Sequence, residues 1–485
     1  AHYRHDCSNY EFQNQLQRLF YCYDGETEVL TELGWIPIRD IVQKRMRVRV
    51  ATLNPTVNQV EYHYPLDYLK QQYRGRMFHH TGKKIDVLVT PNHRLYVATS
   101  GYKEFRLIPA EQAPKSIAYR KDFPYQNGKK PEYFILPPVI RYHYVGRGKG
   151  RRLTWKQSSP RQIPMRPFLK LLGWYLAEGS VRPEKGQISI AQKQLLYRDE
   201  IKAILQELGI QYTESKSAIV FTDRALARYF ATLGRHAAEK HIPRDILALA
   251  PELLRELLDA LIKGDGCKYL NCKCDAWYYY SISNQLADDV QELALKCGYV
   301  ADVYEDSYNK LWRVHIATAS NTTLPNGNRS VETYNPWIEW EGDVYCLTVP
   351  NHIIYVRRNG KAYWCGNSWN QNLRQGAESL FTNISFFDRY YIESLFGDNL
   401  LPLLDLEIKD VERVQRQVME YHTEEILNRN ILRFPVITCA LSKQEDQVGD
   451  QDFFQFALEQ NFQHTMYNFL VMKNLKAIAS CCRLI

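Results

Sequence analysis

The chain has 485 residues, of which 45% are hydrophobic and 24% charged, a balance typical of soluble globular proteins with about three domains. No run approaches the roughly 18 uninterrupted apolar residues of a membrane helix, and the 11 cysteines are too scattered for a disulfide framework. Composition therefore excludes membrane-spanning, secreted, disordered and collagen-like classes, and predicts a reducing, cytoplasmic location.

Charge is unevenly distributed along the chain. Residues 22–367 carry 49 Lys and Arg against 36 Asp and Glu, whereas residues 368–485 carry 11 against 16. Residues 1–21 are balanced. This pattern predicts a basic insertion inside a mildly acidic host.

The basic block contains two related β segments. It opens at Cys22 with a short strand-turn-strand pattern that runs to Trp35. Residues 85–97 (IDVLVTPNHRLYV) and 344–356 (VYCLTVPNHIIYV) share Pro-Asn-His and Tyr-Val in an alternating β pattern. Two such units near opposite ends of the block predict a pseudo-symmetric β domain that is split by a long insertion.

A basic stretch follows the first β segment. Residues 133–177 contain no Asp or Glu, while Arg and Lys alternate there with Tyr and Trp. Contact with a polyanion explains this composition, because phosphates neutralised by basic side chains release counterions. A solvated basic loop is the alternative. The residues expected to contact DNA are Arg141, Arg147, Lys149, Arg151, Arg152 and Lys156.

Two short apolar segments each end in a small residue, an acid and a glycine. They are residues 171–179 (LLGWYLAEG) and 258–266 (LDALIKGDG). Small residues let two helices pack closely, so the helix ends would bring Glu178 and Asp265 together. Paired carboxylates suit Mg²⁺, which activates water and stabilises a phosphodiester transition state.

These segments resemble the paired motifs of LAGLIDADG homing endonucleases. Lys240, before the second motif, resembles that family's active-site lysine. The resemblance implies an α+β domain with pseudo-twofold symmetry, over about residues 126–334, that cuts double-stranded DNA at a specific site. It implies Glu178 and Asp265 as metal ligands, with Lys240 as the third catalytic residue. Core packing of two apolar helices is the alternative.

The block closes with Asn367, and Ser368 follows it. With Cys22 at the start and the Thr90-x-x-His93 motif, this order resembles an intein, a self-splicing insert, over residues 22–367. The resemblance implies an all-β, horseshoe-like Hint splicing domain, assembled from about residues 22–125 and 335–367.

Elementary chemistry gives roles to these residues. A thiolate is the best side-chain nucleophile near neutral pH, so Cys22 can convert the preceding amide into a thioester. An amide nitrogen leaves badly unless protonated, and the pKa of a histidine such as His93 suits that transfer. Thr90 would hold the scissile carbonyl or its oxyanion.

Ligation needs the residues at the other end. The Ser368 hydroxyl takes over the acyl group as an ester, and Asn367 closes its side-chain amide onto its own carbonyl. The released ester then shifts to the Ser368 amine and leaves a peptide bond. No cofactor is required for splicing.

Two positions depart from the intein pattern. Gly366 stands where a histidine is usual, and Cys346 stands where an aspartate is common. Cyclisation would then depend on His352, on backbone donors or on water. His352 either assists Asn367 or is a core histidine left by the duplication.

The flanking sequence resembles the large catalytic subunit of ribonucleotide reductase, closest to the oxygen-independent types. The resemblance lies in residues 375–385, 433–438 and 480–484. It implies that residues 1–21 and 368–485 are fragments of a partly helical barrel that reduces ribonucleotides once complete. The radical cofactor, a glycyl radical or adenosylcobalamin, stays open. Cys481 or Cys482 is either the thiyl cysteine or part of a buried pair.

The sequence therefore predicts a multidomain α+β precursor: a reductase fragment interrupted by a splicing domain and its nested endonuclease. Two alternatives remain. One is an autoprocessing domain that cleaves without ligating, although Asn367 and Ser368 argue against it because cleavage alone needs neither. The other is a reductase with an inert DNA-binding insertion.

Overall fold

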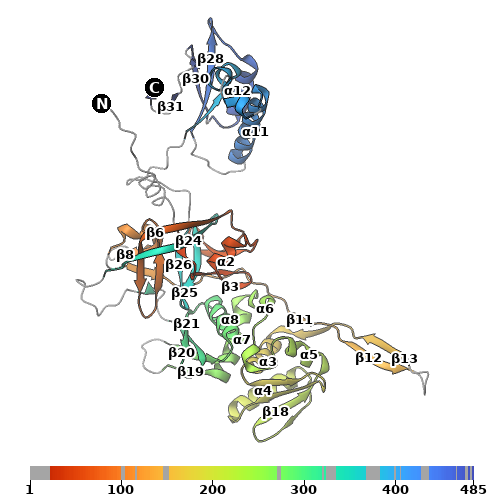
Figure 1. The fold of residues 1–485 in the computed structure, drawn as a ribbon. Coiled ribbons are helices and arrows are strands. Elements are labelled where there is room, and N and C mark those ends of the chain that lie inside the picture. The colour runs from red at the N-terminus through yellow and green to blue at the C-terminus, as the bar shows by residue number, and fades with distance from the viewer. Residues whose placement is uncertain are drawn as a thin grey trace. The chain divides into compact units, whose positions relative to one another are not determined.

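The chain divides into two compact units, residues 1–369 and 370–485. The computed structural model, drawn in Figure 1, describes the ranges 22–99, 104–114, 117–145, 152–269, 275–318, 322–323, 335–367, 383–397, 400–404, 406–427, 436–465, 467–473, 475, 479–480 and 483–484. Each unit is described by itself.

A closed barrel holds both ends of the basic block. Its strands follow the order β1 (Tyr23–Asp24), β24 (Trp337–Thr348), β6 (Asp67–Thr81) and β7 (Asp86–Val89). Strands β6 and β24 are antiparallel over twelve residue pairs. Segments on either side of the long middle region are therefore hydrogen-bonded neighbours.

The strands around the barrel belong to two further sheets. One has the order β23-β10-β8-β9. The other is part of a ten-stranded sheet and has the order β26-β25-β2-β4-β5, with β3 paired to β2. We call β1–β10 and β24–β26, with α2 and η1, the β module. The bounds are β2 (Glu28–Thr31), β3 (Gly34–Pro37), α2 (Ile38–Gln43), β4 (Val50–Asn54), β5 (Gln59–His63), β8 (Arg94–Thr99), β9 (Arg106–Pro109), η1 (Ala110–Gln112), β10 (Ile117–Arg120), β23 (Thr322–Thr323), β25 (Ile353–Arg358) and β26 (Lys361–Gly366).

The two copies of the Pro-Asn-His sequence form matching turns. One joins β7 to β8 and the other joins β24 to β25. The His93 nitrogen donates to the Thr90 carbonyl at 3.0 Å, and the His352 nitrogen donates to the Val349 carbonyl at 3.1 Å. The two turns thus share this hydrogen bond, although His352 has a φ of +54° and His93 has no positive φ.

The middle region, the α/β module, contains two copies of one topology. Helix α3 (Met165–Glu178) leads into a sheet with the order β15-β16-β18-β17, and α7 (Pro251–Asp265) leads into strands with the order β19-β20-β22-β21. The bounds are β15 (Gly179–Arg182), β16 (Gln187–Ala191), α4 (Leu195–Glu207), β17 (Tyr212–Glu214), β18 (Ala218–Thr222), α5 (Arg224–Thr232), η3 (Ala237–Glu239), α6 (Arg244–Leu247), β19 (Gly266–Lys268), β20 (Ala276–Ser281), α8 (Asn284–Lys296), β21 (Val300–Asp306) and β22 (Leu311–Ala317).

A basic hairpin extends from the α/β module. Strands β12 (Ile140–Val145) and β13 (Arg152–Gln157) pair only with each other and project away from the body of the module (Figure 1). At its base, β11 (Tyr133–Leu136) pairs with β14 (Arg161–Pro164). The Arg228 guanidinium holds this base by donating to the Ile140 carbonyl at 2.7 Å.

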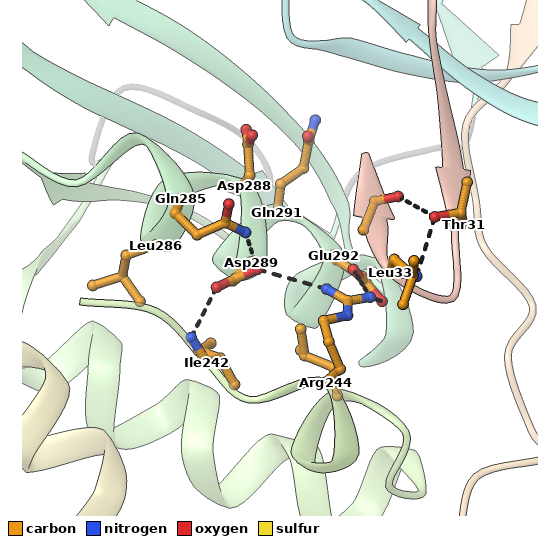
Figure 2. A network of polar contacts seen from close by, with 12 residues as sticks. Thr31, Leu33, Ile242, Arg244, Gln285, Leu286, Asp288, Asp289, Gln291 and Glu292 are labelled. Atoms are coloured by element: carbon orange, nitrogen blue, oxygen red, sulfur yellow. Dashed lines mark hydrogen bonds and ion pairs between the residues drawn. The ribbon is translucent and has the colours of Figure 1, made fainter. Parts of the chain in front are cut away.

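Arg244 links the α/β module to the β module (Figure 2). Arg244 donates to both Glu292 oxygens at 2.8 and 2.7 Å, and to the Glu32 carbonyl in the β2–β3 turn at 3.1 Å. Asp289 accepts a hydrogen bond from the Ile242 nitrogen at 2.8 Å. The Arg244–Glu292 ion pair and the Asp289 contact lie within the α/β module, and of these contacts the bond to the Glu32 carbonyl is the one that reaches the β module.

The second unit contains a parallel sheet with helices. Strand β28 (Val436–Gln444) pairs in parallel with β27 (Asn383–Phe387) and β30 (Tyr467–Met472), and antiparallel with β29 (Gln447–Val448). Its helices are α9 (Arg389–Phe396), α10 (Leu400–Leu403), α11 (Ile408–Leu427) and α12 (Gln451–His464), and a short ladder joins β31 (Ala479–Ser480) to β32 (Arg483–Leu484). Within the described ranges of both units, no helix has the length and apolarity needed to cross a membrane.

Candidate active sites

The two ends of the basic block meet in the β module. Cys22 precedes β1 and Asn367 follows β26, and both residues are buried. The Tyr23 hydroxyl donates to the Gly366 carbonyl at 2.7 Å, and Cys346 contacts the side chains of both Cys22 and Asn367. We call Cys22, Thr90, His93, Cys346 and Asn367 the junction site.

Thr90 contacts the amide nitrogen of Cys22. The Cys22 nitrogen donates to Thr90 Oγ1 at 3.0 Å, and the Thr90 nitrogen donates to the Cys22 carbonyl at 3.0 Å. That amide nitrogen is the leaving group of the expected first step. We expected Thr90 to hold the carbonyl of the preceding residue, Tyr21, which lies outside the described residues.

His93 lies against the same strand. Its ring packs edge-on against Tyr23 with centroids 4.3 Å apart, and its Nε2 lies 3.4 Å from Cys365 Sγ. His352 contributes backbone instead, because its carbonyl accepts from the Asn367 nitrogen at 2.8 Å. Burial and nearby Arg94 lower the pKa of the His352 imidazole, which favours its neutral form.

The Asn367 side chain is held at both ends. Cys346 Sγ donates to Asn367 Oδ1 at 2.8 Å, and Asn367 Nδ2 donates to the Leu347 carbonyl. A side-chain amide fixed in this way loses little rotamer freedom when it attacks its own carbonyl. Burial raises the pKa of the Cys22 thiol well above its usual range, and Cys346 adds to the effect.

The structure explains the glycine before Asn367. A Cβ at Gly366 would lie 2.3 Å from the Arg94 carbonyl and 2.7 Å from Leu107 Cδ2. No side chain fits there unless the backbone moves. The histidine that is usual in inteins at this position therefore has no room in this chain.

The second site lies where α3 and α7 end. A Cβ at Gly173 would lie 2.6 Å from Ala260 Cβ, and one at Gly264 would lie 2.4 Å from Ala177 Cβ. The two helices thus approach as closely as the small residues predicted. Glu178 and Asp265, the last residues of these helices, interact electrostatically.

Lys240 completes the second site. Its Nζ donates to the Tyr175 and Gly179 carbonyls, both at 2.9 Å. Burial lowers the pKa of Lys240 to about 8, against the opposing effect of the two carboxylates. Burial raises the pKa of Asp265 to about 7, to which the charge of Glu178 adds, and burial also raises the pKa of Glu178.

This excess of negative charge fits a divalent cation. Two half-buried carboxylates, of which Glu178 raises the proton affinity of Asp265, would be relieved by a hard cation, for which oxygen is the preferred ligand. Among the described residues, no cluster of three or more His, Cys, Asp or Glu side chains offers a complete protein-only site. Water or phosphate oxygens would have to supply the remaining ligands.

The hairpin register places basic residues together. Arg141 lies opposite Lys156 and Val145 lies opposite Arg152, so these positions share one face of the ribbon. The neighbouring Trp155 is 62% exposed. Several predicted residues lie outside the described ranges: Arg147, Lys149, Arg151, Ser368, Cys481 and Cys482.

Sequence reasoning missed two members of the junction site's surroundings. Tyr23 bonds to a carbonyl 343 positions away, and Cys365 contacts a histidine 272 positions away. Their adjacency to Cys22 and Gly366 is the one signal that the sequence offered for them.

Comparison with known proteins finds a family match in the α/β module. The family described as "LAGLIDADG-like domain" matches residues 167–230 and 252–323, which include Glu178 and Asp265. This part of the chain is therefore a LAGLIDADG-like domain.

Three curated relatives match most of the chain. The C-terminal section of an RNA polymerase β subunit from Stigeoclonium helveticum is 28% identical over 72% of this chain and 36% of its own length. A Clp protease proteolytic subunit from Chlamydomonas moewusii is 23% identical, with 72% and 45% covered. The ribonucleoside-diphosphate reductase β subunit of Aquifex aeolicus is 23% identical, with 74% and 52% covered. The chain spans less than half the length of the first two.

Solved structures show two kinds of similarity. The anaerobic ribonucleotide reductase from Thermotoga maritima is 25% identical over 22% of this chain and 20% of its own, with a TM-score of 0.19. I-DmoI in complex with DNA and Mn is 14% identical over 31% of this chain and 89% of its own, with a TM-score of 0.24.

Proposed function

We propose that residues 22–367 are a self-splicing insert that excises itself and joins residues 1–21 to residues 368–485. The observation that carries this proposal is the junction site. Residues from the two ends of the block, Cys22 and Asn367, are buried at one place and share Cys346 as a neighbour. Chemistry that involves both ends of the block requires that arrangement.

The identity of the relatives supports the same reading. An RNA polymerase subunit, a protease subunit and a reductase subunit have different activities, yet each matches 72–74% of this chain. Residues 22–367 make up a similar share of the chain. An element inserted into unrelated hosts accounts for this pattern better than a shared host activity does.

The first half of the reaction follows from the contacts of Cys22. Its thiol loses a proton and attacks the Tyr21 carbonyl, so that a C–S bond replaces the C–N bond. The amide nitrogen leaves as an amine after taking a proton, for which the His93 imidazole, packed against Tyr23 of β1, is the candidate donor. Thr90 Oγ1 orients that nitrogen through the 3.0 Å hydrogen bond.

The second half uses the other end of the block. The Ser368 hydroxyl displaces the Cys22 thiol from the acyl group, and Asn367 Nδ2 then attacks its own carbonyl and releases Ser368 as a free amine. That amine takes the acyl group from its own hydroxyl. Cys346 and the Leu347 carbonyl position the Asn367 amide, and confinement in one fold can replace up to about 7–11 kcal/mol of activation free energy.

Intact mass after expression tests splicing. Wild type should give a free 22–367 fragment and a ligated 1–21/368–485 product, whereas Asn367→Ala should stall as a branched ester or cleave only before Cys22. Cys22→Ala should block the first step, and Cys439→Ala, a buried thiol in the second unit, should splice normally. Release without ligation would favour the cleavage-only alternative. An uncut 57.0 kDa wild-type chain would contradict the splicing proposal.

A second function rests on the carboxylate pair. We infer that the LAGLIDADG-like domain cuts double-stranded DNA, with Glu178 and Asp265 holding Mg²⁺ and Lys240 set beside them to influence their charge. When bound, the metal supplies an activated water and charge stabilisation. The basic hairpin, with Arg141, Arg152 and Lys156 on one face, would contact phosphates.

Plasmid cleavage tests the nuclease. The substrate carries the host-gene sequence in which the codons for Tyr21 and Ser368 are joined. Wild type with Mg²⁺ should linearise it, while Glu178→Gln and Asp265→Asn should bind it without cutting. Asp259→Asn, an exposed position on α7, should cut like wild type. Equal cutting by all variants would show that the two carboxylates are not needed for catalysis.

The host assignment remains part of the same proposal. The sequence resemblance of residues 375–385 and 433–438 and the parallel strands of the second unit support a reductase fragment whose complete form acts on ribonucleotides. Whether that form uses a glycyl radical or adenosylcobalamin, and whether Cys481 or Cys482 takes part, depends on residues outside the described ranges.

A further inference from the structure

A groove of about 1020 Å³ opens between the two modules. One wall is the outer face of strands β20 and β22, with Tyr278 and His315. The other wall comes from the β module and carries Lys83 and Lys84, between β6 and β7, and Lys361, at the start of β26. Neither wall belongs to the carboxylate site or to the junction site.

The sheet face in this groove is aromatic and basic. Tyr279 pairs with Val314, and both are buried on the core side, whereas Tyr278 pairs with His315 on the opposite face. The Arg313 guanidinium lies 5.3 Å from the centre of the Tyr278 ring. This face belongs to the sheet that Asp265 leads into through β19, so it is continuous with the cleavage site.

The lysine turn is anchored to this sheet by its backbone. The Tyr304 hydroxyl donates to the Lys83 carbonyl at 3.0 Å, and Lys121 Nζ donates to the Lys84 carbonyl at 2.8 Å. Lys121 is in turn held by a buried ion pair with Asp302 at 2.5 Å. The turn is therefore fixed in place while the Lys83 and Lys84 side chains stay exposed.

Most carboxylates in the groove already have cationic partners. Arg357 pairs with Glu28 and Asp288, and Glu26 pairs with Arg39. Glu305 is the exposed exception. In the part of the chain that the structure describes, no ion pair involves the groove cations Lys83, Lys84, Arg313 or Lys361, so the groove presents an excess of positive charge.

We propose that this groove binds the phosphate backbone of double-stranded DNA on one side of the cut, so that the β module is itself part of the DNA-binding surface. The proposal rests on the endonuclease function above. Four strand steps at about 4.8 Å separate β19 from β26, which places the added contacts about 19 Å from the carboxylates. At about 3.4 Å per base pair, the contacts lie about 5–6 base pairs from the cut.

The test uses the full chain with Cys22→Ala and Asn367→Ala, so that it stays intact. The probe is a duplex of about 40 base pairs across the Tyr21/Ser368 codon junction, with Ca²⁺ to allow binding and Mg²⁺ for cutting. The variant Lys83→Glu/Lys84→Glu/Lys361→Glu is compared with Lys44→Glu/Lys70→Glu/Lys409→Glu, which places the same charge change on lysines outside the groove.

The groove variant should bind at least tenfold more weakly, and its slope of log affinity against log salt should fall by about 0.9 for each phosphate that it no longer neutralises. Its footprint should shorten at one end only. If the groove variant had the same affinity, salt slope and footprint as the control variant, the groove proposal would be wrong. Loss of cutting by Glu178→Gln would still support the nuclease proposal. A parent chain that binds the duplex in Ca²⁺ but never cuts would contradict the nuclease proposal. The groove proposal would then be decided by the binding comparison alone. No binding by the parent chain would overturn both.

Discussion

Replacing Asp265 with asparagine should stabilise the first unit while it removes DNA cleavage. Burial raises the pKa of Asp265 to about 7, and Glu178 adds to the shift. An unfolded aspartate titrates near 3.9, so the folded state binds the extra proton between about pH 4 and pH 7. The free energy of unfolding of the wild type therefore falls as pH rises through this window, and the Asp265→Asn variant, which has no proton to release there, avoids that fall.

The size of the effect follows from the shift. About three pH units correspond to about 4 kcal/mol at 1.36 kcal/mol per unit. Lys240 loses one of its two counter-charges in the same variant, which offsets part of the gain. We expect a net stabilisation of about 1–3 kcal/mol above pH 7 that vanishes toward pH 4.

Tryptophan fluorescence during urea unfolding measures this quantity for the first unit alone, because all 9 tryptophans lie within residues 1–369. The splicing-blocked chain with and without Asp265→Asn is unfolded across the pH range, with Asp259→Asn as control. Mg²⁺ should stabilise the chain that keeps Asp265 but not the Asp265→Asn variant. A pH-independent difference, or a less stable variant above pH 7, would refute the reasoning.

Four other substitutions probe the two sites. Gly264→Val forces α3 and α7 apart from a 2.4 Å approach, and should cost about 1–3 kcal/mol in unfolding and lower DNA cutting at least tenfold; unchanged cutting would contradict close helix packing. Cys346→Ala removes the hydrogen bond to Asn367, and mass spectrometry should show succinimide formation slowed about tenfold, with Cys297→Ala unaffected. Gly366→His should abolish splicing rather than speed it, because its Cβ meets the Arg94 carbonyl at 2.3 Å; faster splicing would be the contrary result. Thr90→Ala should slow thiol-induced cleavage before Cys22 about tenfold, while Asn367 cyclisation continues at its usual rate. Equal slowing of cleavage and cyclisation would assign Thr90 a structural role.

Local sequence patterns predicted several elements well. The repeat of Pro-Asn-His and Tyr-Val indicated two related β segments, and the structure has β7 with β8 in one of them and β24 with β25 in the other. Small residues in two segments indicated the close helix pair that brings Glu178 and Asp265 together. These features depend on neighbours within a few positions, or on two motifs that resemble each other.

Contacts between distant residues had no such signal. The Tyr23 hydroxyl reaches Gly366, and Lys121 reaches Asp302, through strand pairings that no local period encodes. The reason for glycine at position 366 is likewise the nearby Arg94 carbonyl, which follows only from how β26 lies against β8. Sequence could indicate candidate reactive residues, but not what surrounds them.

The pairing of β1 with β24 also limits when the β module can complete its fold during synthesis. Tyr23, next to Cys22, pairs with Tyr345, and β6 needs β24 along most of its length. At about 5–20 residues per second, roughly 17–70 s pass between synthesis of Cys22 and of Asn367. Until β24 has been made, Cys22 lacks the strand that completes its surroundings. Under the splicing proposal, a nascent chain would therefore be held back from cleavage before Cys22 until β24 has been made.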